Sequence, residues 1–285
     1  GGRADYATLQ AADDVLDAGA YSMWVQQGTY AAGVTVATNN VYIFFEPGTV
    51  VQAAMTFSGD GITVVLGAQC DVQGLITLSG ANGSPICHGG VDTDGLLISG
   101  NNCFHDGGGW DTLHNGGTAN NGITITGTDC IVQNCSVQTT AGGGEDVDGV
   151  SIEAARGTVR GVKVIDSDER GIFIPAAGAV DSLIESCTVL GADSNGIDTK
   201  APRTRIIGNY VIAAGNDGIQ VGATGDDSIV VGNIVKDQAT QAIDIHSNGE
   251  NCVIVGNRVD DLGSSNGVVD NSGTSTAAGN DETAF

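Results

Sequence analysis

Carboxylates and bases recur at one spacing in the second half of the sequence, as Asp198-Thr199-Lys200 and Asp244-Ile245-His246. Two carboxyl groups at a suitable separation can cleave a glycosidic bond, one as the acid and the other as the base. Lys200 or His246 beside a carboxylate could instead remove a carbon-bound proton, which is lyase or epimerase chemistry. Asp198, Asp244, Lys200 and His246 are therefore the candidate catalytic residues.

These residues belong to a unit that recurs seven times between Gly122 and Gly267. A small residue followed by Ile or Val marks each unit, and the steps are 27, 22, 25, 22, 24 and 25 residues. A second segment, Ile-x-x-Asn-x-Val or a close variant, keeps the same period around Asn209, Asn233 and Asn257. Each unit holds short β-branched segments with the alternation of strands. The repeat predicts an all-β solenoid whose stacked coils pair in parallel, about 4.8 Å apart.

Stacking turns each repeat position into a row along the solenoid. The three asparagines would then form a buried ladder, with each amide bonded to the next. Asp198 and Asp244 fall in one outward row two coils apart, roughly 9.6 Å from each other. That is near the upper limit for the carboxylates of an inverting glycosidase. The alternative is a face of solvated charges and salt bridges, such as Asp148 with Arg170.

The seven cysteines are interpreted as small core residues. Cys130 and Cys252 share a row of small residues, and Cys135 and Cys187 share the row of the asparagine ladder. No spacing of Cys and His residues indicates a zinc site. A single disulfide within the segment 70–103, which we cannot align with the repeat, stays open. Free thiols favour folding in a reducing cytoplasm.

The pattern resembles the right-handed, single-stranded parallel β-helix of the pectate-lyase-like superfamily, over roughly residues 30 to 270. Met23 to Tyr30 looks like the entry segment of such proteins. In style the chain is closest to viral tailspikes and appendages. The resemblance to known enzymes is partial, because Asn195-Gly196-Ile197-Asp198 matches only a fragment of the polygalacturonase Asn-Thr-Asp pattern and the Asp-Pro-His-Glu motif of alginate epimerases is absent.

Three segments are expected along the chain. Residues 1–30 should form an N-terminal capping helix over Tyr6 to Ala18 and an entry strand, because apolar residues recur at helical spacing before Gly19. Residues 31–270 should form the β-helix. Residues 271–285 read as a polar C-terminal tail, which leaves the last coil open for a partner. No secretory signal and no membrane-spanning apolar run is evident.

Two interruptions of the repeat, Asn101 to Asn121 and Gln138 to Asp148, are expected to form loops. Loops that project from a rigid scaffold often carry binding residues. An exposed Trp110 between polar residues would suit a sugar, although it could equally pack on the coil below. The candidate ligand-binding residues are His105, Asp106, Trp110, Asp111, His114, Glu145 and Asp146.

The charge balance restricts the partners. Ten basic and 34 acidic residues give a net charge of −24, which argues against nucleic acid and anionic membranes. An acidic surface with few lysines is typical of proteins from high salt, where ions screen self-repulsion. It also suits calcium, the one cofactor that the composition suggests, because Asp- and Gly-rich loops supply oxygen ligands. The two interpretations are compatible.

These observations favour a virion or extracellular-surface module that recognises a host-surface glycan, with or without modifying it. The first alternative is a carbohydrate-active enzyme, namely a polysaccharide lyase, an epimerase or a glycoside hydrolase. The second alternative is a purely structural spacer. The resemblance to tailspikes implies a homotrimer, and another virion protein at the C-terminal end is the competing expectation.

Overall fold

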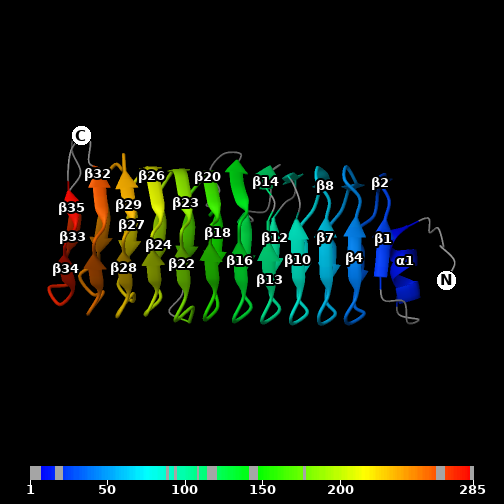
Figure 1. The fold of residues 1–285 in the computed structure, drawn as a ribbon, viewed down its shortest axis with the longest axis horizontal. Coiled ribbons are helices and arrows are strands. Elements are labelled where there is room, and N and C mark those ends of the chain that lie inside the picture. The colour runs from blue at the N-terminus through cyan, green and yellow to red at the C-terminus, as the bar shows by residue number, and fades with distance from the viewer. Residues whose placement is uncertain are drawn as a thin grey trace.

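The computed structural model describes residues 8–16, 22–87, 90–92, 95–107, 109–113, 121–140, 147–175, 178–260 and 267–282. The chain winds into one stack of coils, and each coil adds one strand to each of three parallel sheets. Figure 1 shows the stack from the side, with its N-terminal end on the right and its C-terminal end on the left. The all-β solenoid expected from the repeat is confirmed.

The three sheets run the length of the stack and contain 12, 12 and 11 strands. Sheet A consists of β1 (Ser22–Val25), β4 (Tyr42–Phe45), β7 (Thr63–Leu66), β10 (Ser84–Cys87), β13 (Phe104–Asp106), β16 (Ile131–Gln133), β19 (Thr158–Arg160), β22 (Leu183–Glu185), β25 (Arg205–Ile207), β28 (Ile229–Val231), β31 (Val253–Val255) and β34 (Thr276–Ala278). Sheet B consists of β2 (Thr29–Tyr30), β5 (Val50–Val51), β8 (Cys70–Val72), β11 (Gly90–Asp92), β14 (Gly109–Leu113), β17 (Ser136–Thr140), β20 (Lys163–Ser167), β23 (Thr188–Ala192), β26 (Tyr210–Ala214), β29 (Ile234–Lys236), β32 (Arg258–Asp260) and β35 (Asp281–Glu282). Sheet C consists of β3 (Val34–Val36), β6 (Met55–Phe57), β9 (Ile76–Leu78), β12 (Leu96–Ile98), β15 (Ile123–Ile125), β18 (Val150–Ile152), β21 (Ile172–Ile174), β24 (Ile197–Thr199), β27 (Ile219–Val221), β30 (Ile243–Ile245) and β33 (Val268–Asp270).

The asparagine ladder lies at the turn between sheets A and B, as the repeat predicts. The backbone N–H and the Nδ2 of Asn209 donate to Oδ1 of Asn233 at 2.8 and 3.0 Å. Asn233 makes the same pair of bonds to Asn257, at 2.9 and 3.0 Å. The ladder continues to Asn280, which accepts from Asn257 at 3.0 and 3.1 Å. Buried amide groups are thus satisfied by the same position of the next coil.

The repeat glycine directly precedes most of the sheet C strands, where its Cα lies close to a valine of sheet B. A Cβ on Gly196 would lie 2.2 Å from Cγ1 of Val211 and 2.7 Å from the carbonyl oxygen of Gly218. Gly149 and Gly171 are equally close to the valine of the coil that follows them. Glycine avoids this overlap because it lacks a Cβ, and Ala242, before β30, is the one larger residue at this position between Gly122 and Gly267.

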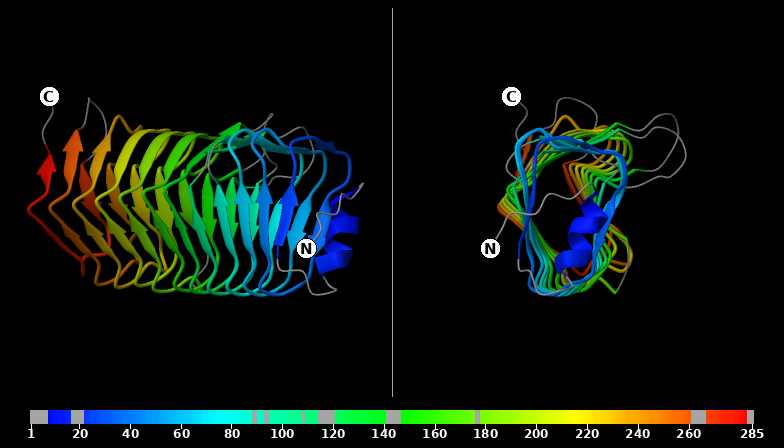
Figure 2. Two further views of the ribbon diagram at one scale, coloured as in Figure 1. Left: turned by 45° about the vertical axis from the view of Figure 1, so that its right-hand side comes forward. Right: turned by 90° about the vertical axis from the view of Figure 1, so that its right-hand side faces the viewer.

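The N-terminal end is covered by helix α1 (Leu9–Leu16), which lies inside the range expected for the capping helix. Leu9 is buried in the core, and Figure 2 shows the helix across the opening of the first coil. Within the described parts of the chain, no helix is long and apolar enough to cross a membrane.

The boundary expected at residue 270 is wrong, because the β-helix continues to Glu282. Strands β34 and β35 pair with β31 and β32, so the polar segment forms part of a further coil instead of a tail. Ser275 occupies the row of small residues and accepts from the backbone N–H of Cys252 at 3.0 Å. The segment lacks the apolar residues that mark the other coils, so its repeat could not be recognised in the sequence.

Six cysteines, namely Cys70, Cys103, Cys130, Cys135, Cys187 and Cys252, are free and buried in the core. Their interpretation as core residues is confirmed, and neither Cys70 nor Cys103 takes part in a disulfide. Burial raises the pKa of the Cys135 thiol, so it stays protonated. The side chain of Cys87 lies outside the described residues.

Candidate functional site on sheet C

The outward positions of five sheet C strands form one row across the middle of the stack. Strand pairing joins Ser151 to Phe173, Phe173 to Asp198, Asp198 to Gln220, and Gln220 to Asp244. We call these five residues the sheet C row. Asp198 and Asp244 are therefore two coils apart in one row, as the sequence predicts, with Gln220 between them.

A second row lies one residue before the repeat glycine. It contains Asp148, Arg170, Asn195 and Asp217, and we call it the pre-glycine row. Asp148, Asn195, Asp198, Asp217 and Asp244 each expose 8% or less of their surface. The expectation of a solvated charged face is thus wrong for these residues, although the ion pair between Asp148 and Arg170 is confirmed at 3.2 Å. Stacked neighbours cover side chains that point away from the core.

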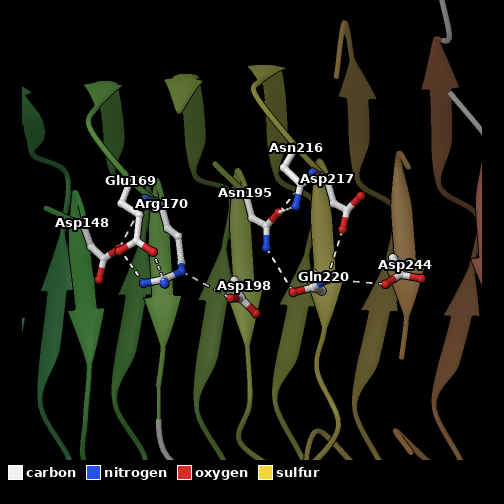
Figure 3. Close-up of polar contacts among 9 residues, drawn as sticks. All are labelled: Asp148, Glu169, Arg170, Asn195, Asp198, Asn216, Asp217, Gln220 and Asp244. Carbon is white, nitrogen blue, oxygen red and sulfur yellow. Dashed lines mark hydrogen bonds and ion pairs between the residues drawn. The ribbon is translucent and has the colours of Figure 1, made fainter. Parts of the chain in front are cut away.

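Arg170 is the centre of an acidic cluster that spans three coils (Figure 3). Its Nη1 contacts Oδ1 of Asp148 at 3.2 Å, its Nη2 contacts Glu169, and its Nε lies 3.4 Å from Oδ2 of Asp198. The guanidinium also lies over the ring of Phe173, 3.8 Å from the centroid. One cation therefore faces three carboxyl groups, so the cluster carries excess negative charge when all three are ionised.

Amides and carboxylates form a continuous network on the C-terminal side of this cluster (Figure 3). Asn195 donates to Gln220 at 3.1 Å and accepts from Asn216 at 2.9 Å. Gln220 in turn donates to Asp217 at 3.1 Å and to Asp244 at 3.5 Å. These hydrogen bonds fix the orientation of the side chains that they join.

Asp198 lies between the two halves of the site. Its Oδ2 faces Arg170, while its Oδ1 is buried and has no hydrogen-bond partner among the described residues. Burial raises the pKa of Asp198 to about 6, although Lys200 and Arg170 oppose the rise. A buried acceptor without a donor is uncommon in a folded protein and calls for an explanation, such as a bound water, an ion or a functional role.

Two other carboxyl groups also hold their protons more strongly than usual. Burial raises the pKa of Asp148 to about 7, against the opposing charge of Arg170. Burial, and then the nearby charge of Asp217, raises the pKa of Asp244. Carboxyl groups that exchange a proton near neutral pH can serve as general acids or bases.

Lys200 and His246 occupy the same position in their coils, two residues after Asp198 and Asp244, and both are exposed. Lys200 Nζ lies 5.1 Å from the centroid of the Phe173 ring. Both bases therefore lie at the rim of the buried rows, and the catalytic role of the four candidates remains a prediction. Glu169, Asn216 and Gln220 were missed as partners, and only their fixed spacing from the repeat glycine signals them.

The loop expected over Asn101 to Asn121 is wrong in its first part, because β13 and β14 form there. His105 is fully buried and pairs with Val132 in the inward row, so it is a core residue and not a ligand-binding one. Phe104 takes an outward position beside it. The shared row of Cys103 and Cys130, 27 residues apart, is the signal that would have aligned this coil.

The other candidates in the interruptions are only partly described. Asp106 is half-buried and accepts from Nδ2 of Asn134 at 2.9 Å. Trp110 and Asp111 belong to β14 and hold the register positions of Val137 and Gln138 in β17. His114, Glu145 and Asp146 lie outside the described residues, so their ligand-binding role remains a prediction.

No group of three or more His, Cys, Asp or Glu side chains within the described ranges is arranged to hold a metal ion. Asp198 and Asp244 are separated by the Gln220 amide, and Asp148 is paired with a guanidinium. Calcium binding therefore stays a prediction that the described side chains do not support.

Comparisons with known proteins agree with the fold. The family model described as the right-handed β-helix region matches residues 121–281. This match covers more than half of the sequence, and the chain belongs to that family. A comparison with curated proteins gave no match.

Solved structures with the same fold include two double mutants of the tailspike protein of E. coli bacteriophage HK620. They are 14% identical, have TM-scores of 0.67 and 0.70, and cover 92% and 95% of this chain and 60% of theirs. The chain thus spans about 60% of the length of that tailspike. The A-module of mannuronan C-5 epimerase AlgE6 from Azotobacter vinelandii is 13% identical with a TM-score of 0.64, over 96% of this chain and 94% of the module. At such identity these likenesses establish the fold alone.

Proposed function

We propose that this β-helix binds a glycan along the sheet C row and the pre-glycine row. The observation that carries the proposal is the unpartnered Oδ1 of Asp198, within a face whose neighbouring polar groups are bonded to one another. Because this oxygen is buried, the Asp198 side chain must turn outward for a glycan hydroxyl to supply the missing donor. The hydrogen bond to a charged acceptor is the stronger kind, worth about 1.5 to 3 kcal/mol.

The charges of the site indicate which glycan it takes. Asp148, Glu169, Asp198, Asp217 and Asp244 outnumber the nearby cations, and a polyuronate would be repelled by them. The ligand is therefore a neutral glycan, or one with amino groups. A tailspike of the same fold has been solved in complex with a pentasaccharide, which supports a sugar ligand.

The location of the protein is part of the same proposal. A virion or extracellular-surface protein that meets a host-surface glycan suits a rigid rod with a binding face along its side. A saline environment suits the net charge of −24, because ions screen the repulsion between acidic coils.

A second candidate function is hydrolysis of the bound glycan, and the raised pKa of Asp198 favours it. The acid of a glycosidase must be protonated near working pH, and Asp198 with a pKa of about 6 meets that requirement. Asp244 lies two strands away in the same row, roughly 9.6 Å at the usual strand spacing. That separation is near the upper limit for the two carboxyl groups of an inverting enzyme, and the Gln220 side chain lies between them.

The test is a glycan array with the wild-type chain, followed by titration of any hit against two variants. Asp198→Ala removes the acceptor and should weaken binding by about tenfold or more. Asp198→Asn keeps an acceptor, so it should bind and yet lose any turnover. Asp237→Asn, an exposed turn position away from the site, is the matched control and should behave as the wild type.

If Asp198→Ala binds a glycan from the array as tightly as the wild type does, that glycan binds elsewhere on the β-helix. An array without hits would leave the structural spacer as the better account. Retained turnover in Asp198→Asn would exclude Asp198 as the acid while leaving the binding proposal intact.

A further inference from the structure

The outer face of sheet A is unusual because it gathers exposed apolar side chains at both of its ends. Trp24, Tyr42 and Val253 expose 62%, 44% and 38% of their surface, and they are the exposed large hydrophobic residues of the described chain. All three lie on sheet A, in β1, β4 and β31. Figure 1 shows the strands of this sheet side by side along the whole stack.

Each end carries an apolar patch. The N-terminal patch consists of Trp24, Tyr42 and Phe44. Trp24 is held rigidly, since its ring lies 4.5 Å from that of Phe44 and its Nε1 donates to Glu46 at 2.7 Å. The C-terminal patch consists of the outward residues Ile207, Ile229, Val231, Val253 and Val255. Trp and Tyr side chains are enriched among the residues that contribute most to protein interfaces.

The middle of the same face carries polar side chains beside half-buried apolar ones, Ile131 and Leu183. Gln133, Arg160 and Glu185 occupy successive strands there, and Nε of Arg160 donates to Gln133 at 2.6 Å. The most exposed apolar side chains of the face therefore lie toward its two ends, and Arg160 and Glu185 lie at its centre. Such a pattern matches a second copy of itself when the copy is turned end to end.

The distribution of charge selects this orientation. Residues 4–155 contain no Lys or Arg, and nine of the ten basic residues lie between Arg156 and Arg258. Two copies that run side by side in the same direction would set their purely acidic halves against each other. Two copies that run in opposite directions instead set each acidic half against the half with the cations, which lowers the repulsion.

We propose that two copies of this chain associate through the outer faces of sheet A in antiparallel orientation. The N-terminal patch of each copy packs on the C-terminal patch of the other, and a two-fold axis passes through the polar centre. The two-fold axis relates two equivalent pairs of patches, so a single interface covers both apolar ends of each copy. Sheet C faces away from this contact, and the glycan site of each copy stays open.

The first test is the molar mass in solution by light scattering. The wild type should have twice the monomer mass of 28.6 kDa. Val253→Glu places a charge in the C-terminal patch, where the side chain points outward, and should shift the protein to the monomer without loss of thermal stability. Asn248→Glu adds the same charge at an exposed turn position and should remain dimeric.

The second test is cross-linking, which reads the orientation. Tyr42→Cys and Val253→Cys chains, mixed and treated with a bifunctional maleimide, should cross-link to each other, while neither should cross-link alone. The six described thiols are buried, and the wild-type chain under the same treatment is the background control. A monomeric or trimeric wild type, a Val253→Glu dimer, or cross-linking of Tyr42→Cys chains alone would overturn the proposal.

Discussion

Replacing the buried acid of the sheet C row should stabilise the protein while it removes any turnover. Burial raises the pKa of Asp198 from its ordinary value of 3.8 to about 6. The folded state therefore binds the proton more tightly than the unfolded state, and the ionised carboxylate opposes folding at higher pH. A pKa that moves over this range corresponds to roughly 3 kcal/mol. Asp198→Asn should accordingly raise the free energy of unfolding by up to about 3 kcal/mol at pH 8.

The sign of the pH dependence follows from the same pKa. Stability due to this group is fully present below about pH 4 and is lost as the pH rises through about 6. The advantage of Asp198→Asn should therefore fall to roughly half at pH 5. Urea unfolding at pH 5 and pH 8, followed by circular dichroism, measures both values.

Asp217→Asn is the matched control for this measurement. Asp217 is as buried as Asp198, but its carboxylate accepts from Gln220, Thr240 and the backbone N–H of Gln241. Its replacement should therefore destabilise the protein at both pH values. An Asp198→Asn protein that is less stable than the wild type at pH 8, or whose advantage does not change with pH, would refute the reasoning.

Three further outcomes are expected. Asn233→Ala should lower the free energy of unfolding by about 3 kcal/mol and Asn280→Ala, at the more exposed ladder end, by about 1 kcal/mol; equal urea midpoints would contradict the ladder's role. Gly196→Ala should destabilise by about 2 kcal/mol or more because its Cβ would overlap a sheet B valine, whereas Gly178→Ala, with open space around the added carbon, should be neutral in thermal unfolding. Arg170→Met should raise the pKa of both aspartates that it contacts, and carbon-13 NMR titration would reveal an unchanged value if the ion pairs are absent.

The rows of the solenoid could be predicted because they depend only on spacing. Asn209, Asn233 and Asn257 recur every 24 residues, so any parallel stack places them on top of one another. The same spacing placed Asp198 and Asp244 in one row. The spacing failed at His105 because a histidine there occupies a row of apolar residues. It failed at the last coil because small and polar residues replace the aliphatic ones.

The sequence predicts which residues lie on the proposed binding face, but it does not predict their burial or their contacts. The sequence places Asp148 and Arg170 in adjacent coils, and their ion pair follows from that. It does not reveal that Glu169 and Asp198 share the same guanidinium, because those contacts depend on how the side chains lean across the coils. The shared guanidinium and the burial together set the pKa values of Asp148 and Asp198.

The sequence by itself therefore determined the β-helix, its ladder and the membership of each row, since a period of 22 to 27 residues dictates which residues stack. Only the tertiary structure decided that the outward row of sheet C is buried and that Asp198 keeps an oxygen without a partner. The burial and the pKa of these carboxyl groups depend on how the side chains of neighbouring coils pack over them, and spacing along the chain does not determine that packing.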